Sequence, residues 1–215
     1  MIRNIVFDMG QVLIRFDLNI FLDKVGVTDP ADRELLRREV FLSLEWARMD
    51  RGSLPDTEAA EIICRRVPER LREAVYKLVT FWDRPILEIP GMCELIEELK
   101  ARGYGIYLLS NASKAQHRYW PKFPVSRYFD GKLISCDILR VKPMHEIYEH
   151  FTGQFGLKPE ECLMIGNDDI CDCRGAAAAG IDSLYIQTEQ SPDPVSELPE
   201  NCRGILSLAE ITKYM

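Results

Sequence analysis

The segment Ile5–Leu13 (IVFDMGQVL) places a carboxylate and a glycine directly after a short apolar run. The apolar residues predict a buried strand, and Asp8 stands where that strand ends and the chain turns at Gly10. In open α/β sheets, ligands bind in the crevice outside the carboxyl ends of the strands. Asp8 is therefore the first candidate for a functional residue, although an Asp at a strand end is also a common turn residue.

From residue 85 onward, apolar segments of strand length alternate with helical segments. This alternation predicts an α/β fold whose core is a doubly wound, mostly parallel, Rossmann-like sheet. The predicted strands in this part of the chain cover residues 104–109, 132–136, 162–165 and 183–186. The predicted helices cover residues 92–100, 113–120, 144–155, 172–179 and 206–214.

Residues 17–84 differ in character, because their apolar side chains recur at helical spacing. Leu36, Val40 and Leu44 fall on one face of a predicted amphipathic helix. Two further helices are predicted over residues 56–67 and 71–82. We therefore expect two units, an α/β core formed by residues 1–16 and 85–215 and an inserted all-helical unit formed by residues 17–84.

The composition limits the partners and the location that we expect. A net charge of −7 without a run of Lys or Arg does not favour nucleic-acid binding. No apolar stretch approaches the roughly 18 residues that a membrane span requires. The first residues enter a strand without a signal-peptide pattern, so we expect a cytoplasmic protein. We also expect either a monomer or a homodimer. The seven cysteines are odd in number and scattered, which argues against a disulfide framework.

Polar residues follow three of the predicted strands, and one lysine precedes a helix. These residues are Asp8, Ser110-Asn111, Asn167-Asp168-Asp169 and Lys142. Lysine and serine are suitable donors to an anionic substrate, and paired carboxylates suit Mg²⁺, which prefers oxygen ligands. A carboxylate beside the metal can attack phosphorus and form an aspartyl-phosphate. We interpret Asp169 as a helix N-terminal acid that the helix dipole favours.

Four segments, in this order, resemble the four motifs of the haloacid dehalogenase superfamily. They are Phe7–Leu13, Leu109–Asn111, Lys142-Pro143 and Ile165–Asp172. The helical insert between the first two resembles the type-1 cap of that superfamily, and Arg51–Leu54 resembles the same branch. The first motif reads Asp-x-Gly-x-Val and is similar to that of sugar-phosphate phosphatases. The resemblance covers nearly the whole chain and implies an α/β hydrolase core with a helical cap.

The resemblance implies catalytic and metal-binding roles for the residues that match the motifs. Asp8 would be the nucleophile, and Lys142 would neutralise charge that the metal does not. The ligands of Mg²⁺ would be Asp8, the main-chain carbonyl of Gly10 and Asp168. Asn167 and Asp172 would lie in the outer shell of the metal site or orient Lys142.

The substrate implied by the resemblance is a small phosphorylated metabolite. Ser110, the Asn111 amide and Lys142 would hold its phosphoryl oxygens. On the cap, Arg51 is a candidate to bind the substrate. Further candidates for specificity, by cap position alone, are Arg15, Trp46 and Trp82.

Gly10 is the main departure from the family pattern. Most phosphatases of this superfamily carry a second Asp there, which acts as general acid and then as general base. General acid–base catalysis typically contributes 10²–10⁴-fold in rate. One hypothesis is a phosphatase that uses easier leaving groups, such as those of sugar 1-phosphates. Asp17 and Asp50 are candidates to replace the missing carboxylate.

Two other hypotheses also accommodate Gly10. In a metal-free 2-haloacid dehalogenase, Asp8 attacks carbon and needs no acid at the second position. The founding dehalogenases lack an acidic metal ligand at the position of Asp168, however, so the last motif favours Mg²⁺. The third hypothesis is a non-catalytic module that binds a phosphorylated ligand. We reject a response-regulator receiver domain, because its acidic residues occur in the reverse order along the chain.

Overall fold

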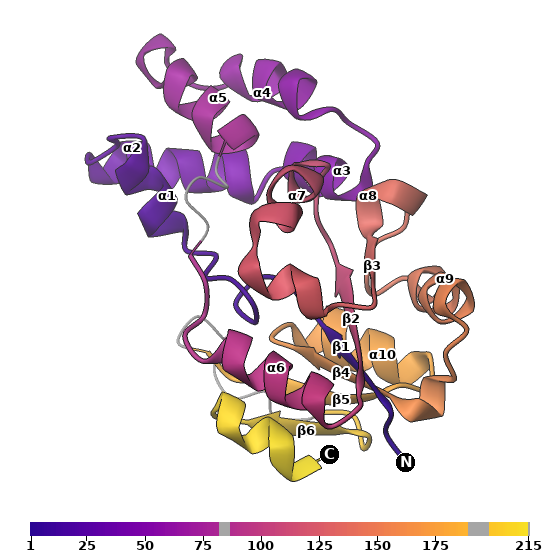
Figure 1. The fold of residues 1–215 in the computed structure, drawn as a ribbon. Coiled ribbons are helices and arrows are strands. Elements are labelled where there is room, and N and C mark those ends of the chain that lie inside the picture. The colour runs from indigo at the N-terminus through magenta and orange to yellow at the C-terminus, as the bar shows by residue number, and fades with distance from the viewer. Residues whose placement is uncertain (82–86, 189–197, 215) are drawn as a thin grey trace.

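Six strands form one sheet in the computed structural model, which describes residues 1–81, 87–188 and 198–214 (Figure 1). The strands are β1 (Asn4–Phe7), β2 (Gly105–Ser110), β3 (Gly131–Ile134), β4 (Cys162–Gly166), β5 (Asp182–Ile186) and β6 (Cys202–Ile205). Their order is β3-β2-β1-β4-β5-β6, and every pairing is parallel. This is the order of a Rossmann-type sheet, so the predicted α/β fold with a Rossmann-like core is confirmed.

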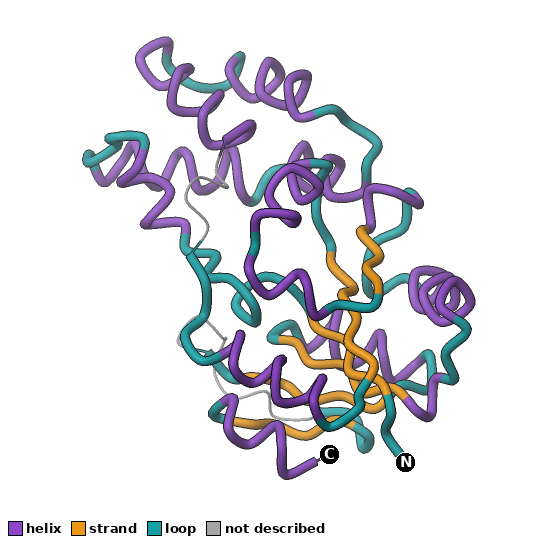
Figure 2. The backbone as a smooth tube through the Cα atoms, viewed as in Figure 1, coloured by secondary structure: helices purple, strands orange, loops and turns teal. Residues whose placement is uncertain are grey.

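The strand order makes β1 the centre of the functional edge. β1 pairs with β2 on one side and with β4 on the other, and Figure 2 shows the strands lying side by side. From β1, the chain first adds β2 and β3 on one side and then adds β4, β5 and β6 on the other side. Such a switch point leaves a crevice at the carboxyl ends of the strands. The residues that follow β1, β2 and β4 therefore face a common space.

Helices cover both faces of the sheet, because alternate residues of a strand point to opposite faces. Ile5 and Phe7 belong to one buried cluster with α6, whereas Val6 belongs to another with α9 and α10. The helices of the core are α6 (Met92–Ala101), α7 (Ala115–Tyr119), α8 (Ser135–Ile138), α9 (His145–Phe155) and α10 (Gly175–Ala178). Shorter helical turns cover Trp120–Lys122, Pro124–Tyr128, Pro159–Glu161, Asp169–Arg174 and Leu208–Tyr214.

The segment between β1 and α6 is helical and has a buried cluster of its own. Its helices are α1 (Leu18–Lys24), α2 (Pro30–Leu36), α3 (Leu44–Arg51), α4 (Asp56–Cys64) and α5 (Arg72–Phe81), with short turns at Arg37–Phe41 and Glu69–Leu71. Figure 1 shows α4 and α5 far from the sheet and α3 near α8. The predicted boundary at residues 84 and 85, and Trp82, lie outside the described residues. No helix in the described ranges is long and apolar enough to cross a bilayer.

The prediction that Leu36, Val40 and Leu44 share one buried helix face was wrong. Leu36 and Val40 are fully buried, but Leu44 is 70% exposed. The chain passes through a π-helical turn at Arg37–Phe41, and the side chain of Ser43 then accepts a hydrogen bond from Trp46 N (3.1 Å). Ser43 thus caps a new helix, so the spacing of the apolar residues does not continue across it.

Three elements of the α/β core also differ from the prediction. The predicted strand at residues 132–136 ends at Ile134, because its partner β2 ends at Ser110, the residue paired with Ile134. The following residues form the short helix α8 instead. The edge strand β6 was missed, because its four residues contain no continuous apolar run. The helix predicted at residues 172–179 begins earlier, as a π-helical turn at Asp169–Arg174.

Gly166, the last residue of β4, gives a test of the packing at the functional edge. A Cβ added there would overlap the carboxylate of Asp172, whereas one added at Gly153 in α9 would meet nothing within 4 Å. We expect Gly166→Ala to destabilise the protein by about 1–3 kcal/mol through overpacking. Gly153→Ala should instead be neutral or stabilising by about 0.5–1 kcal/mol. The unfolding free energies of both variants are measured by urea denaturation, and equal values for Gly166→Ala and Gly153→Ala would contradict the predicted overpacking.

Candidate active site

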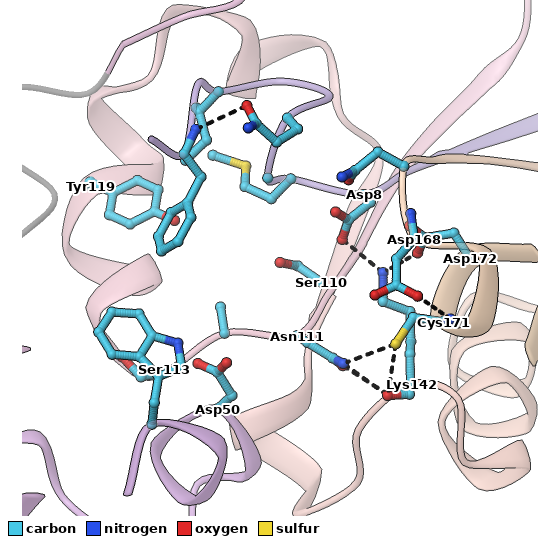
Figure 3. Close-up of a pocket in the computed structure, with 18 residues that line it drawn as sticks. Asp8, Asp50, Ser110, Asn111, Ser113, Tyr119, Lys142, Asp168, Cys171 and Asp172 are labelled. Carbon is cyan, nitrogen blue, oxygen red and sulfur yellow. Dashed lines mark hydrogen bonds and ion pairs between the residues drawn. The ribbon is translucent and has the colours of Figure 1, made fainter. Parts of the chain in front are cut away.

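A cavity of about 260 Å³ opens at the carboxyl edge of the sheet. Core residues and residues of α3 both line it, as Figure 3 shows. The lining residues that matter most are Asp8, Ser110, Lys142 and Asp168 from the core and Trp46 and Asp50 from α3. The structure therefore brings together residues that are predicted to be functional and lie far apart in the sequence.

Lys142 lies between two carboxylates at the base of this cavity. Its Nζ donates hydrogen bonds to Asp8 Oδ1 (2.7 Å) and Asp172 Oδ1 (2.6 Å). The side chains of Lys142 and Asp172 are only 2% and 1% exposed, and that of Asp8 is 15% exposed. A buried charge requires a partner, and here one cation serves two anions.

The protonation of this cluster follows from burial and from its neighbours. Burial opposes the charge of Lys142, but Asp172 and Asp8 outweigh it and hold the lysine pKa well above its usual value. Burial raises the pKa of Asp172 to about 7, with Asp8 adding to the rise and Lys142 opposing it. The ammonium group of Lys142 therefore stays charged at neutral pH and faces the nucleophile candidate.

Asn111 fixes the main chain of Lys142 across a separation of 31 residues. Asn111 Oδ1 accepts from Lys142 N (2.8 Å), and Asn111 Nδ2 donates to Lys142 O (2.9 Å). The side-chain amide of Asn111 is thus committed to the lysine, and its main-chain amide is the group left for a ligand. Ser110, at the end of β2, is 2% exposed and lines the cavity.

Asp168 organises the loop after β4. Its Oδ1 accepts from the main-chain N–H groups of Ile170 (2.9 Å) and Cys171 (2.7 Å). Its own N–H donates to Asp172 Oδ2 (3.1 Å). These bonds hold the carboxylate of Asp168 and the neighbouring Asn167 at the cavity wall.

The oxygen groups on this wall fit a hard divalent cation. The carboxylates of Asp8 and Asp168 and the main chain of Gly10 line the same cavity. Oxygen ligands of this kind suit Mg²⁺, which is commonly held by one or two carboxylates and several waters. Asp172, in contrast, is already paired with Lys142.

Arg51, a predicted substrate-binding residue, is not among the residues that line the cavity. Its Nε donates to the carbonyl of Leu139 (3.3 Å), and its side chain is on the surface. α3 ends at Gly52, which adopts φ of 81° and lies so close to Cys136 O that a Cβ would overlap it. Asp50, the residue before Arg51, lines the cavity, and neighbouring residues of a helix point in different directions, so Arg51 points elsewhere.

Asp17 and Asp50, the two candidates for the role of the carboxylate missing at Gly10, differ in their position relative to the cavity. Asp17 caps α1, where its Oδ1 accepts from Asn19 N (2.9 Å), and it pairs with Arg15 (3.3 Å). Neither Asp17 nor Arg15 lines the cavity, whereas Asp50 does. Trp46 of α3 also lines it.

Ser113, Tyr119 and Cys171 are among the cavity residues that sequence reasoning missed. Ser113 lies three residues after Ser110, and Cys171 lies three residues after Asp168. Cys171 lies in the helical turn that Asp168 caps, and such a turn returns to the same side of the chain, so its spacing was a usable signal. Ser113 follows β2 in a segment that is not helical, so its spacing was no such signal. No comparable signal identifies Tyr119.

The chain belongs to the haloacid dehalogenase-like hydrolase family, whose model matches residues 2–180. The glyceraldehyde 3-phosphate phosphatase of Methanothermobacter thermautotrophicus is 24% identical over 127 residues, which are 58% of this chain and 55% of that relative. The chain therefore spans about half of that phosphatase. The (S)-2-haloacid dehalogenase 4A of Burkholderia cepacia is 25% identical over 219 residues, which are 98% of this chain and 93% of that relative.

The fold is shared with solved structures of the same family. The HAD hydrolase YfnB from Bacillus subtilis, in a crystal form bound to magnesium, is 18% identical with a TM-score of 0.73. That comparison covers 99% of this chain and 98% of YfnB. The family and the fold are thus established, and the protein is a HAD-like hydrolase.

Removal of Lys142 tests the electrostatic arrangement of the site. Lys142→Ala would leave Asp172 and Asp8 buried side by side without a cation, so we expect a loss of about 3–5 kcal/mol in unfolding free energy. The measurement is urea denaturation at neutral pH. Lys122→Ala is the control, because Lys122 is exposed on the surface. Equal effects of the two substitutions would contradict the assigned role of Lys142.

Proposed function

We propose that the protein is a Mg²⁺-dependent phosphatase that hydrolyses a small phosphomonoester through an aspartyl-phosphate on Asp8. The observation that carries this proposal is the contact of Lys142 with Asp8 beside a cavity lined by Ser110 and Asp168. A carboxylate nucleophile, a fixed cation and hydroxyl and amide donors are the groups that phosphoryl transfer needs.

The phosphoryl group would lie between Asp8 and the donors at the end of β2. The ammonium of Lys142, the hydroxyl of Ser110 and the main-chain N–H of Asn111 would donate to its oxygens. Such preorganised donors stabilise charge that develops in the transition state. The side-chain amide of Asn111 would position Lys142 through the two hydrogen bonds described above.

The ligands of Mg²⁺ would be Asp8, the carbonyl of Gly10 and Asp168, with Asn167 and Asp172 in the outer shell. Bound Mg²⁺ would supply positive charge to the phosphoryl oxygens in addition to that of Lys142. The magnesium in the YfnB structure supports this assignment at the level of the family.

Residues 17–84 would act as a cap that selects the substrate, while the core supplies the chemistry. Trp46 and Asp50 of α3 line the cavity, so the helical segment already contributes to the site. Closure of the cap would exclude bulk water from the reaction. A cavity of about 260 Å³ favours a small phosphorylated metabolite. The glyceraldehyde 3-phosphate phosphatase relative agrees with a substrate of this class.

A metal-free 2-haloacid dehalogenase is the second candidate function. Gly10 favours it, because attack of Asp8 on carbon needs no acid at that position. The match to (S)-2-haloacid dehalogenase 4A along 98% of the chain supports it as well. The acidic residue Asp168 on the cavity wall favours the phosphatase instead. A non-catalytic module that binds a phosphorylated ligand is the third alternative.

The first test is phosphate release from sugar phosphates, nucleotides and p-nitrophenyl phosphate, with Mg²⁺ and with EDTA. We expect release with Mg²⁺ only and a fall to background in Asp8→Asn, which lacks the nucleophile. Asp169→Asn is the matched control, because Asp169 pairs with Arg174 (3.5 Å) and does not line the cavity. Release that survives Asp8→Asn would contradict the proposed intermediate.

Halide release separates the two candidate enzymes. The phosphatase should release no chloride from 2-chloropropionate in EDTA, because its site is built for a phosphoryl group. Chloride release under these conditions, abolished by Asp8→Asn, would replace the phosphatase by the dehalogenase. Binding of inorganic phosphate without turnover of any ester would favour the non-catalytic module.

A further inference from the structure

The proposed phosphatase lacks the acid that most of its relatives carry at the position of Gly10. We propose that Asp50, at the end of α3, protonates the leaving oxygen of the substrate and then activates the water that hydrolyses the intermediate. This inference rests on the proposed function. It assigns to a residue of the helical segment the role that is missing from the first motif.

The position of Asp50 suits this role. Asp50 lines the same cavity as Asp8, and Figure 3 shows the two carboxylates on opposite sides of it, with Ser110 between them in that view. In phosphoryl transfer the attacking and leaving oxygens lie roughly in line on opposite sides of phosphorus. A phosphoryl group near Ser110 that is attacked by Asp8 would therefore direct its leaving oxygen toward Asp50.

Asp50 is held by groups of the core as well as by its own helix. Its carboxylate accepts hydrogen bonds from the main-chain N–H of Ser113 and from the side chain of Trp46. Its main-chain carbonyl accepts from Ser135 Oγ (2.5 Å). The close approach of Gly52 to the backbone of Cys136 fixes the end of α3 on the core. The carboxylate is thus positioned, and a positioned group is the requirement for proton transfer.

The surroundings of Asp50 favour its protonated form. Burial in the cavity wall raises its pKa well above the usual range, and the negative charges of Asp56 and Asp8 raise it further. The hydrogen bonds that it accepts from Ser113 and Trp46 act in the opposite direction. Asp56, on α4, also faces Arg118 (3.5 Å). The thiol of Cys136 on α8 lies close enough to interact with Asp50, and burial raises the pKa of that thiol to about 12, so it is neutral.

Both steps balance with water as the single co-reactant. In the first step, a carboxylate oxygen of Asp8 bonds to phosphorus, the phosphorus–ester oxygen bond breaks, and the leaving oxygen takes the proton of Asp50. In the second step, Asp50, now ionised, takes a proton from water while the water oxygen bonds to phosphorus. The bond between Asp8 and phosphorus breaks, inorganic phosphate leaves, and Asp50 is protonated again.

Space does not explain the absence of an acid at Gly10. A Cβ added there would have Phe16 Cβ as its nearest neighbour, at 3.9 Å, which is ordinary van der Waals contact. A side chain can therefore begin at this position without a clash at its Cβ. Gly10→Asp provides a rescue experiment for the loss of Asp50.

The experiment compares Asp50→Asn with Asp17→Asn on two substrates. One is the best sugar phosphate or nucleotide of the panel, called the alkyl phosphate below because its leaving group is an alcohol, and the other is p-nitrophenyl phosphate. Asp17→Asn is the matched control, because Asp17 caps α1 outside the cavity and Asn also caps helices well. We expect kcat for the alkyl phosphate to fall about 10²–10⁴-fold in Asp50→Asn, with KM changing much less. The fall of kcat/KM at high pH, which reports the loss of the proton from Asp50, should disappear. Asp17→Asn should match the wild type.

With p-nitrophenyl phosphate, Asp50→Asn should release one equivalent of p-nitrophenol per site in a burst and then turn over slowly. The burst is expected because this leaving group needs no proton, whereas hydrolysis of the intermediate still needs a base. The double variant Gly10→Asp/Asp50→Asn should hydrolyse the alkyl phosphate with a kcat at least about tenfold higher than that of Asp50→Asn alone. Asp50→Ser gives the same test if Asp50→Asn does not fold.

A variant with raised KM but unchanged kcat and unchanged pH profile would overturn the inference, because Asp50 would then only bind the substrate. An active wild type with an equally active Asp50→Asn would overturn this inference alone. A wild type that releases no phosphate from any ester would overturn the proposed function and this inference with it.

Discussion

The buried ammonium of Lys142 between Asp8 and Asp172 is the interaction on which the rest of the site depends. Two carboxylates cannot lie side by side in a protein interior unless a cation or a proton offsets their repulsion. The lysine comes from the loop before α9, and the acids follow β1 and β4. One charge cluster therefore ties together three distant segments of the chain. Asn111 adds the end of β2 by fixing the main chain of the lysine.

The parallel sheet is what makes this cluster possible. Because β1 lies between β2 and β4, the carboxyl ends of all three strands meet at one edge. The backbone leaves room for the cluster, since Gly166 has no side chain where the carboxylate of Asp172 packs. The loop after β4 is held in turn by hydrogen bonds to Asp168. In the proposed enzyme, the core would thus present a prearranged set of charges to the substrate, as electrostatic catalysis requires.

The helical segment contributes to the cavity through the end of α3. Trp46 and Asp50 reach the cavity, and Gly52 brings the helix against the backbone of α8. In the proposed enzyme, the two parts of the chain supply different groups. The charged groups that would hold the metal and the phosphoryl group come from the core, and the proposed acid comes from the helical segment. A family whose members differ in the helical segment could in this way change substrate while retaining the core.

The sequence by itself determined the fold class and the candidates at the strand ends. Buried strands appear as short apolar runs, so the residue pattern alone placed Asp8, Ser110 and Asp168 at the edge of a parallel sheet. Only the tertiary structure decided which side chains meet in the cavity. It selected Asp50 over Asp17 and directed Arg51 to the surface, because these outcomes depend on contacts between residues far apart in the sequence. Such contacts arise from packing, which local sequence patterns do not encode.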